Sequence, residues 1–196
     1  MTEEKKSRLP IILGWLFGIV FAVGIGAVWY ITSPVFLVTL LSSDNVQSRR
    51  WAADELVRQG EGAGKHALGV AMNQSVDLEA RRLAIFILGE IHYREATPQL
   101  LSFFKGDNPT LQEQSAYALG RMGDASLGPE LVGAYDAAPK GLKMKIISAL
   151  GELSTEPGMA LLKRESATNT DETIRGAAAY SYNKLVLEKK KADGAR

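Results

Sequence analysis

A step of 31 residues recurs through the centre of this sequence. Leu-Gly pairs stand at positions 88–89, 119–120 and 150–151, and each closes an apolar stretch that precedes a charged turn and a shorter apolar stretch. A fixed period of this size is typical of a solenoid, because each unit has one apolar face too many to be stable alone and buries it against its neighbours. The period therefore predicts an all-α fold, a short solenoid of about five helical pairs.

The same step aligns residues that suit the inside of such a stack. One series of equivalent positions is Ala53, Ala84, Ser115, Ile146 and Ala177, and another is Leu56, Ile87, Ala118, Ala149 and Tyr180. A third series, Leu100, Leu131 and Leu162, belongs to the second helices. We expect the small residues to let helices approach closely and the leucines to fill the space between layers. We also expect the glycine of each Leu-Gly pair to end its helix in the left-handed conformation, which glycine adopts without strain.

Capping residues, glycines and prolines delimit the expected helices. Ser33-Pro34 starts a short connecting helix, Asp44 and Asp77 are candidate N-caps, and residues 60–64 are expected to form a glycine-rich turn. The expected helices of the repeat domain cover residues 45–59, 65–72, 78–91, 97–105, 109–122, 128–135, 141–153, 157–164 and 172–190. The chain thus divides into a polar tail (1–9), an apolar segment (10–32), a connecting or capping helix (33–43), the repeat domain (44–187) and a polar C-terminal tail (188–196).

The N-terminal apolar segment predicts a membrane anchor. Pro10 to Ile31 is a run of 22 residues without a charge, and about 20 such residues span the hydrocarbon core of a bilayer. Trp29 and Tyr30 stand at its far end, where aromatic rings favour the headgroup region. A cleaved signal peptide is the alternative, although its apolar region normally covers only about 7–15 residues. We therefore expect one transmembrane helix over residues 10–32.

Basic residues indicate how this segment is oriented. Lys5, Lys6 and Arg8 precede it, whereas the first basic residue after it is Arg49. Positively charged flanks stay in the cytoplasm, so we expect a cytoplasmic N-terminus. In a bacterium the repeat domain would then be periplasmic, anchored in the inner membrane by a single pass.

Small residues recur every four positions within the anchor, at Gly14, Gly18, Ala22 and Gly26. Such a stripe lets another helix backbone approach closely in lipid. It predicts a transmembrane partner helix, either from a second copy of the chain or from another protein.

Composition and motifs favour a protein without catalytic chemistry. The sequence has no cysteine, which excludes thiolate metal sites and cysteine nucleophiles. His66 and His92 lack the spacing of a metal or acid–base site, and no phosphate loop, dinucleotide motif or nucleophile elbow occurs. The 23 basic and 22 acidic residues give no net charge that would attract nucleic acid. We expect no enzyme activity, cofactor, metal or nucleic-acid partner.

The repeat units share an order of motifs. Ala118-Leu119-Gly120 is followed by Pro129 and Leu131, and Ala149-Leu150-Gly151 is followed by Pro157 and Leu161-Leu162. This order resembles HEAT repeats, in particular the short bacterial kind named after phycobilin lyases, over residues 44–187. The resemblance implies a right-handed superhelix of antiparallel helix pairs that binds other proteins, with the second helices lining the concave face.

The predicted partner-binding residues therefore lie on the second helices, at positions that point away from the core. They are Gln99, Ser102, Phe103, Glu130, Gly133, Lys163 and Arg164. Together these features predict a non-enzymatic, membrane-anchored scaffold or adaptor, a subunit or assembly factor of a membrane or envelope complex. Two alternatives remain: a lyase-like or chromophore-handling protein, and a secreted solenoid released by signal cleavage.

Overall fold

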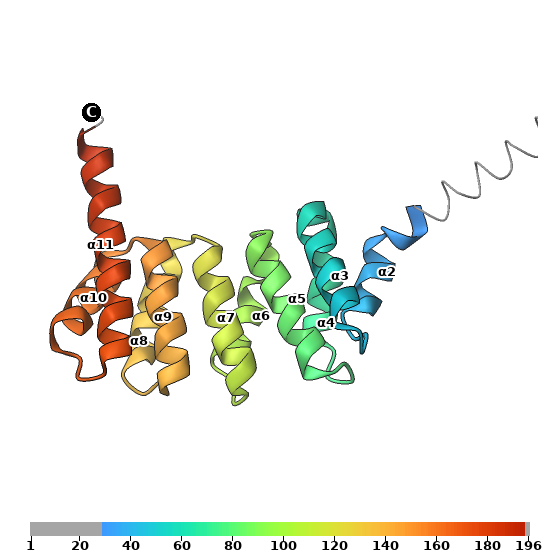
Figure 1. Ribbon diagram of the computed structural model, residues 1–196, viewed down its shortest axis with the longest axis horizontal. Helices are drawn as coiled ribbons and strands as arrows, with labels where there is room; N and C mark the ends of the chain where they lie inside the picture. Colours follow the sequence, from blue (N-terminus) through green and yellow to red (C-terminus); the bar gives the residue numbers. More distant parts are fainter. Residues whose placement is uncertain (1–28, 195–196) are drawn as a thin grey trace, which may run out of the picture.

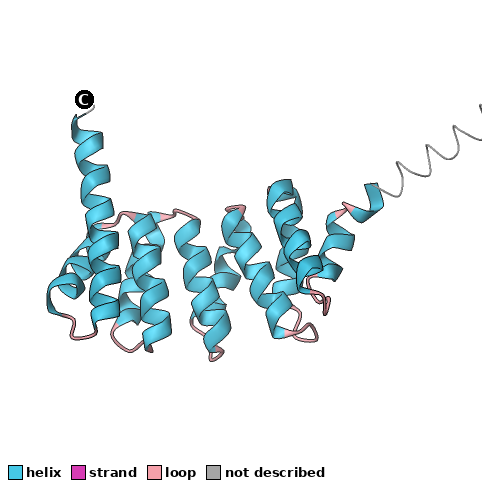
Figure 2. Ribbon diagram, in the orientation of Figure 1, coloured by secondary structure: helices cyan, strands magenta, loops and turns pink. Residues whose placement is uncertain are grey.

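Helix pairs stacked in one row form the part of the chain that the computed structural model describes, residues 29–194 (Figure 1). Within these residues there are helices and loops but no strand, as predicted (Figure 2). The α-helices are α2 (Pro34–Leu40), α3 (Val46–Gln59), α4 (Glu61–Met72), α5 (Leu78–Glu90), α6 (Thr97–Phe104), α7 (Pro109–Arg121), α8 (Gly128–Tyr135), α9 (Lys140–Leu153), α10 (Glu156–Thr168) and α11 (Glu172–Gly194). Two 3-10 turns, η1 (Arg94–Ala96) and η2 (Ala125–Leu127), precede α6 and α8.

The first helices of the pairs stand side by side, and the second helices lie behind them (Figure 1). In the row of first helices, α5 packs against α7, α7 against α9, and α9 against α11. Each second helix packs against the first helix that follows it in the chain. The described residues thus contain four complete pairs, from α3/α4 to α9/α10, with α2 and α11 covering the two ends.

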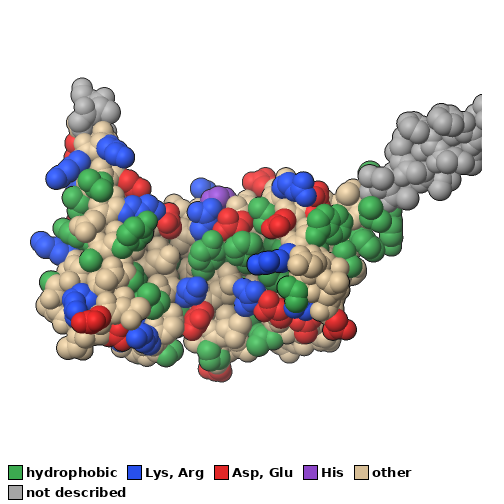
Figure 3. Space-filling view, in the orientation of Figure 1, with side chains coloured by type: hydrophobic (Ala, Val, Ile, Leu, Met, Phe, Trp, Pro, Cys, Tyr) green, Lys and Arg blue, Asp and Glu red, His purple; other side chains and the backbone are tan. Residues whose placement is uncertain are grey.

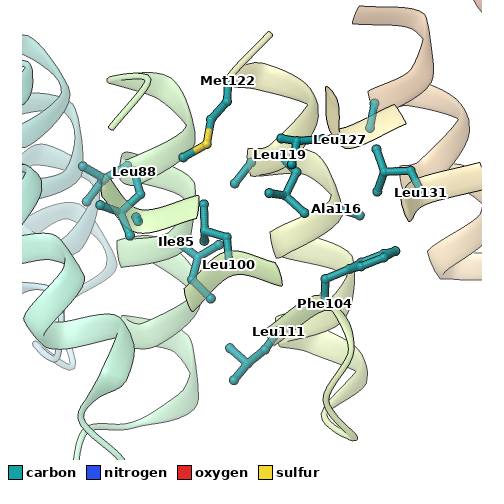
Figure 4. Close-up of a cluster of buried hydrophobic side chains, with 14 of the residues drawn as sticks. Ile85, Leu88, Leu100, Phe104, Leu111, Ala116, Leu119, Met122, Leu127 and Leu131 are labelled. Carbon is teal, nitrogen blue, oxygen red and sulfur yellow. The ribbon is translucent and has the colours of Figure 1, made fainter. Parts of the chain in front are cut away.

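Leucines of the repeat fill the space between the two rows (Figure 4). Leu100, Leu131 and Leu162 are all fully buried, which confirms their predicted place in the second helices. Leu88 and Leu119, from the Leu-Gly pairs, are buried with them. The 31-residue step is therefore a packing period, set by the need to bury one apolar face of every helix.

The prediction that the Leu-Gly glycines adopt a left-handed conformation is wrong. Gly89, Gly120 and Gly151 lie inside α5, α7 and α9, and each touches the next first helix. A Cβ atom added to Gly89 would lie 2.7 Å from the Cα of Ala118, and one on Gly120 would lie 2.5 Å from the Cα of Ala149. These glycines are needed for close approach of two backbones rather than for helix termination.

Three residues further along the chain, a residue in the left-handed conformation follows α5, α7 and α9. It is His92 (φ 55°), then Gly123 (φ 67°), then Ser154 (φ 51°), again 31 residues apart. Only one of the three is a glycine, so residue type alone does not mark the position.

The predicted series of inward-facing positions is correct as far as α9, and in α11 the buried position lies one residue later than predicted. Ala53, Ala84, Ser115 and Ile146 are buried as predicted, but Ala177 is only half-buried and its neighbour Ala178 is fully buried. Tyr180, predicted to be internal, is 75% exposed, and Ser181 takes its place against Gly151. The last step is therefore 32 residues, so that Lys184 stands opposite Glu152.

Other differences concern helix starts. The expected turn over residues 60–64 is wrong, because α4 already begins at Glu61 and only Gly60 has a positive φ. Gly64 is helical and packs against the ring of Tyr93, where a Cβ would lie 2.2 Å from a ring carbon. Asn45 rather than Asp44 caps α3, while Asp77 caps α5 as predicted.

The connecting helix α2 covers the start of the solenoid. Ser33 caps it and Pro34 is its first residue, as expected. Leu37 and Leu41 are fully buried where α2 packs against α3 and α4. The predicted transmembrane helix lies outside the described residues except for positions 29–32, and so do Gly14, Gly18, Ala22 and Gly26. Across residues 29–194, no helix combines the length and apolar character that crossing a membrane requires.

Candidate partner-binding surface

A groove of about 630 Å³ opens beside α8. Its walls come from the end of α6, from α7 and α8, from the loop after α8 and from the start of α9. The lining residues are Phe104, Lys105, Gln112, Pro129, Glu130, Gly133, Ala134, Ala137, Ala138, Pro139 and Leu142.

The groove exists because small residues gather where two second helices stand apart. Gly133, Ala134, Ala137 and Ala138 leave no side chain long enough to fill the space. A Cβ atom on Gly133 would meet nothing within 4 Å. Phe104 and Leu142 belong to the buried core and present apolar surface at this point. The groove therefore offers an apolar surface that the fold itself does not cover.

Its rim is polar and mixed in charge. The Lys105 ammonium lies 2.8 Å from the Glu130 carboxylate, which links α6 to α8 across the groove. Gln112 donates from Nε2 to the backbone oxygen of Gly106 at 2.6 Å and so fixes the loop after α6. An apolar interior with a polar rim is the usual anatomy of a protein-binding surface.

Two of the seven predicted partner-binding residues, Glu130 and Gly133, line this groove. Gln99, Ser102 and Phe103 lie on α6, and Lys163 and Arg164 lie on α10, outside the lining. The side chain of Phe103 is half-buried, with the Arg81 guanidinium 5.8 Å from its ring centre, whereas Phe104 is buried. Lys105 and the loop residues Ala137, Ala138 and Pro139 were not predicted, although a run of small residues ending in proline signals such an opening.

Arg164 takes part in a polar cluster around the buried carboxylate of Glu165. Its Nε donates to Glu165 at 2.8 Å and its Nη2 donates to Asp136 at 2.9 Å. Glu165 is only 6% exposed and also accepts hydrogen bonds from the Tyr135 hydroxyl and the Asn169 amide. Burial alone would raise the pKa of Glu165, but the three hydrogen bonds outweigh it and lower this pKa below its ordinary value. The cluster thus ties α8 to α10, and the Arg164 side chain is less available to a partner than the sequence suggests.

The first-helix face carries a row of equivalent charged residues. Glu90, Arg121, Glu152 and Lys184 come from α5, α7, α9 and α11, and their signs alternate. Figure 3 shows charges of both signs on the face formed by the first helices. Arg121 lies 3.0 Å from Glu90, and Lys184 lies 2.8 Å from Glu152. Tyr117 donates to Glu90 at 2.6 Å, and burial together with this hydrogen bond raises the pKa of Tyr117 to about 12. These contacts link neighbouring units, so we assign this row a structural role.

Metal ligands do not converge in the described part of the chain. Between residues 29 and 194, no three His, Asp or Glu side chains come together in a way that could bind an ion. His92 is exposed in the turn after α5, and His66 is half-buried on α4.

Comparison with known proteins supports the repeat assignment. Residues 66–150 match the family model described as HEAT repeats. No curated protein matches the chain at the level of sequence. A chain from the complex of CpcE and CpcF of phycocyanin lyase from Nostoc sp. PCC7120 is similar in structure, with a TM-score of 0.66 at 18% identity. The similarity covers 77% of this chain and 98% of that chain.

A second similar structure is that of an engineered protein, with a TM-score of 0.54 at 15% identity. This similarity covers 85% of this chain and 84% of the other. At such identities the two structures show the fold alone. The chain is therefore an all-α solenoid with HEAT-like repeats.

Proposed function

We propose that this protein is a non-enzymatic, membrane-anchored scaffold that binds another protein through the groove beside α8. The observation that carries this proposal is the groove itself: an open apolar surface, lined by small residues and rimmed by Lys105 and Glu130. An apolar side chain or a short helix of a partner would fill the groove. Polar groups of the partner would pair with Lys105 and Glu130 at the rim.

Membrane anchoring is supported by the sequence before the solenoid. The uncharged run from Pro10 to Ile31 is long enough to span a bilayer, and Lys5, Lys6 and Arg8 favour a cytoplasmic N-terminus. On this basis the scaffold belongs to an inner-membrane or envelope complex with its repeats in the periplasm. N-terminal sequencing of the mature chain separates this proposal from a secreted, signal-cleaved form. A reporter fused to the C-terminus that is active on only one side of the membrane tests the orientation.

Filling the groove is expected to abolish partner binding without unfolding the protein. Gly133→Leu places an isobutyl group in open space, because nothing lies within 4 Å of a Cβ at this position. We expect recovery of the partner to fall at least about tenfold, as is common when a central interface position is blocked. The measurement is quantitative mass spectrometry after pull-down from detergent-solubilised membranes, with the melting temperature measured in parallel.

Gly69→Leu is the matched control, since Gly69 is also helical, lies on α4 and has nothing within 4 Å of its Cβ. A partner lost with Gly133→Leu and retained with Gly69→Leu supports the groove. Equal recovery with both variants would show that the groove is not the binding surface.

A second candidate function is suggested by the similarity to a phycocyanin lyase complex. The groove volume of about 630 Å³ lies within the range of small-molecule sites, about 300–1,000 Å³. On this alternative the protein handles a chromophore or another small molecule, as one subunit of a pair. Visible absorption that co-purifies with the protein and disappears in Gly133→Leu would favour it over the scaffold.

A further inference from the structure

One edge of the solenoid carries both ends of the described chain (Figure 1). The first helices end at this edge. Gln59, the last residue of α3, donates from Nε2 to the backbone oxygen of Thr32 at 2.6 Å, which places the start of the chain here. At the other end of the row, Lys184 meets Glu152 near the end of α9, and α11 then continues to Gly194. These ten further residues extend the helix by about 15 Å.

The start of the described chain is an exposed apolar cluster. Trp29 is 74% exposed, Tyr30 59% and Val35 60%, and Ile31 is exposed beside them. Trp29, Tyr30 and Ile31 are the last three residues of the uncharged run that begins at Pro10. Tryptophan and tyrosine favour the headgroup region of a bilayer, where an apolar ring and a polar group are both accommodated. A lipid surface therefore suits this cluster better than water does.

No flexible linker separates this cluster from the repeats. The rings of Tyr30 and Phe36 lie 5.3 Å apart across the start of α2. Leu37 and Leu41 are fully buried, and α2 packs against both α3 and α4. The hydrogen bond from Gln59 to the backbone oxygen of Thr32 connects the end of α3 to the segment before α2. The direction in which the chain leaves the solenoid is thus fixed by packing.

The opposite end of the same edge is basic. Lys189, Lys190 and Lys191 are exposed near the end of α11. Basic side chains are visible on the part of this helix that projects beyond the row (Figure 3). Glu188 and Asp193 reduce the net charge there. Between the two ends, the turns along the edge expose charges of both signs: Glu61, Glu95 and Glu156 are accompanied by Arg58 and Arg94. The Glu156 carboxylate lies 3.9 Å from the Lys189 ammonium. The aromatic cluster at one end and the run of lysines at the other are the two features of this edge that suit a membrane surface.

We propose that this edge faces the bilayer, in a fixed orientation. The Trp29–Ile31 cluster lies among the lipid headgroups, and the lysines of the α11 tip contact anionic headgroups. Glu61 and Glu95 lie in the turns between these two contacts. Glu156 lies beside Lys189, so Lys190 and Lys191 are the lysines left for the headgroups. The groove extends to the loop after α8, at the opposite edge, and remains open to a partner. This inference rests on the proposed membrane anchoring but not on the identity or existence of a partner.

Each basic residue near an anionic surface contributes about 1 kcal/mol of attraction. The anchor keeps the α11 tip close to the membrane, so even this weak contact is populated, because it forms within a single tethered molecule. The solenoid is accordingly held by one strong and one weak attachment.

The absence of cysteine allows a direct test on the full chain. Ala125→Cys labels the edge just after α7, and Asp107→Cys labels the other end of the same helix; both side chains are exposed. The 13 residues of α7 separate the labels by about 20 Å. The labelled protein is reconstituted in vesicles that contain anionic lipid and an acceptor dye on the headgroups. We expect severalfold more energy transfer from position 125 than from position 107.

A flexible Gly-Ser segment inserted between Ile31 and Thr32 is the control, and it should remove the difference. A label at Ala192→Cys should lose transfer when Lys189, Lys190 and Lys191 are all changed to glutamine. Equal transfer from positions 125 and 107 in the uninterrupted chain would overturn the fixed orientation and leave the anchoring intact. Failure of the chain to float with the vesicles would overturn the anchoring and this inference together. Unchanged transfer in the lysine variant would overturn the second contact.

Discussion

Gly120→Ala is expected to lower the free energy of unfolding by about 2 kcal/mol, although alanine is normally the better helix former. The added methyl group would lie 2.5 Å from the Cα and 2.6 Å from the Cβ of Ala149, so α7 and α9 must move apart. Neither neighbouring atom belongs to a flexible side chain, and the strain cannot be relieved by a rotamer change. Urea unfolding of the full chain in detergent, followed by circular dichroism, measures the effect.

Gly69→Ala is the control for this prediction. Gly69 is also inside a helix, α4, but nothing lies within 4 Å of its Cβ position. We expect this substitution to stabilise the protein by about 0.5–1 kcal/mol, the usual gain when alanine replaces a helical glycine. If both variants were stabilised alike, the close contact between α7 and α9 would not exist in solution.

Glu165→Gln is expected to cost about 2 kcal/mol at neutral pH, since hydrogen bonds to a buried charged group contribute about 1.5–3 kcal/mol. A glutamine amide can accept from only some of the three donors that surround Glu165, and it cannot neutralise Arg164. Glu172→Gln, at a carboxylate that is 89% exposed, should change stability by no more than about 0.5 kcal/mol. Urea unfolding of the three proteins side by side measures both effects.

The same residue gives stability a dependence on pH. Hydrogen bonds lower the pKa of Glu165 in the folded protein, so its contribution is present above the ordinary carboxyl pKa. As pH falls through the lowered folded pKa, the wild-type protein loses this contribution, whereas the Glu165→Gln variant has no such contribution to lose. The unfolding free energies of the two proteins should therefore converge at acidic pH. Curves that stay parallel down to low pH would show that the charge of Glu165 does not stabilise the fold.

The period of the repeat was sufficient to predict which layers form. The burial of Leu100, Leu131 and Leu162 follows from the spacing alone, because each second helix must bury one apolar stripe. The N-caps Asp77 and Asn108 accept hydrogen bonds from backbone amides three residues further along the chain, so these helix starts also depend on local sequence. These features depend on residues close to one another in the chain.

What the period could not predict depends on the approach of neighbouring units. A glycine near a helix end suits both a left-handed turn and a close helix contact, and only the position of Ala149 decides between them at Gly120. The last step of the repeat is one residue longer than the others, and no residue type in the sequence indicates this. Tyr180 was therefore predicted to be buried, although it is exposed. The groove likewise arises from the separation of α6 and α8, which no single segment encodes.

The alternating row of Glu90, Arg121, Glu152 and Lys184 restricts how this protein could have gained or lost repeats. From α5 to α11 the sign changes at every step, and ion pairs join Arg121 to Glu90 and Lys184 to Glu152, whereas the equivalent residue of α3, Gln59, is neutral. Removing one unit, α7 with α8, would bring Glu90 beside Glu152, whereas removing two would bring Glu90 beside Lys184 and keep opposite signs together. Between α5 and α11, a change in the number of repeats therefore keeps opposite charges side by side only when it adds or removes two units.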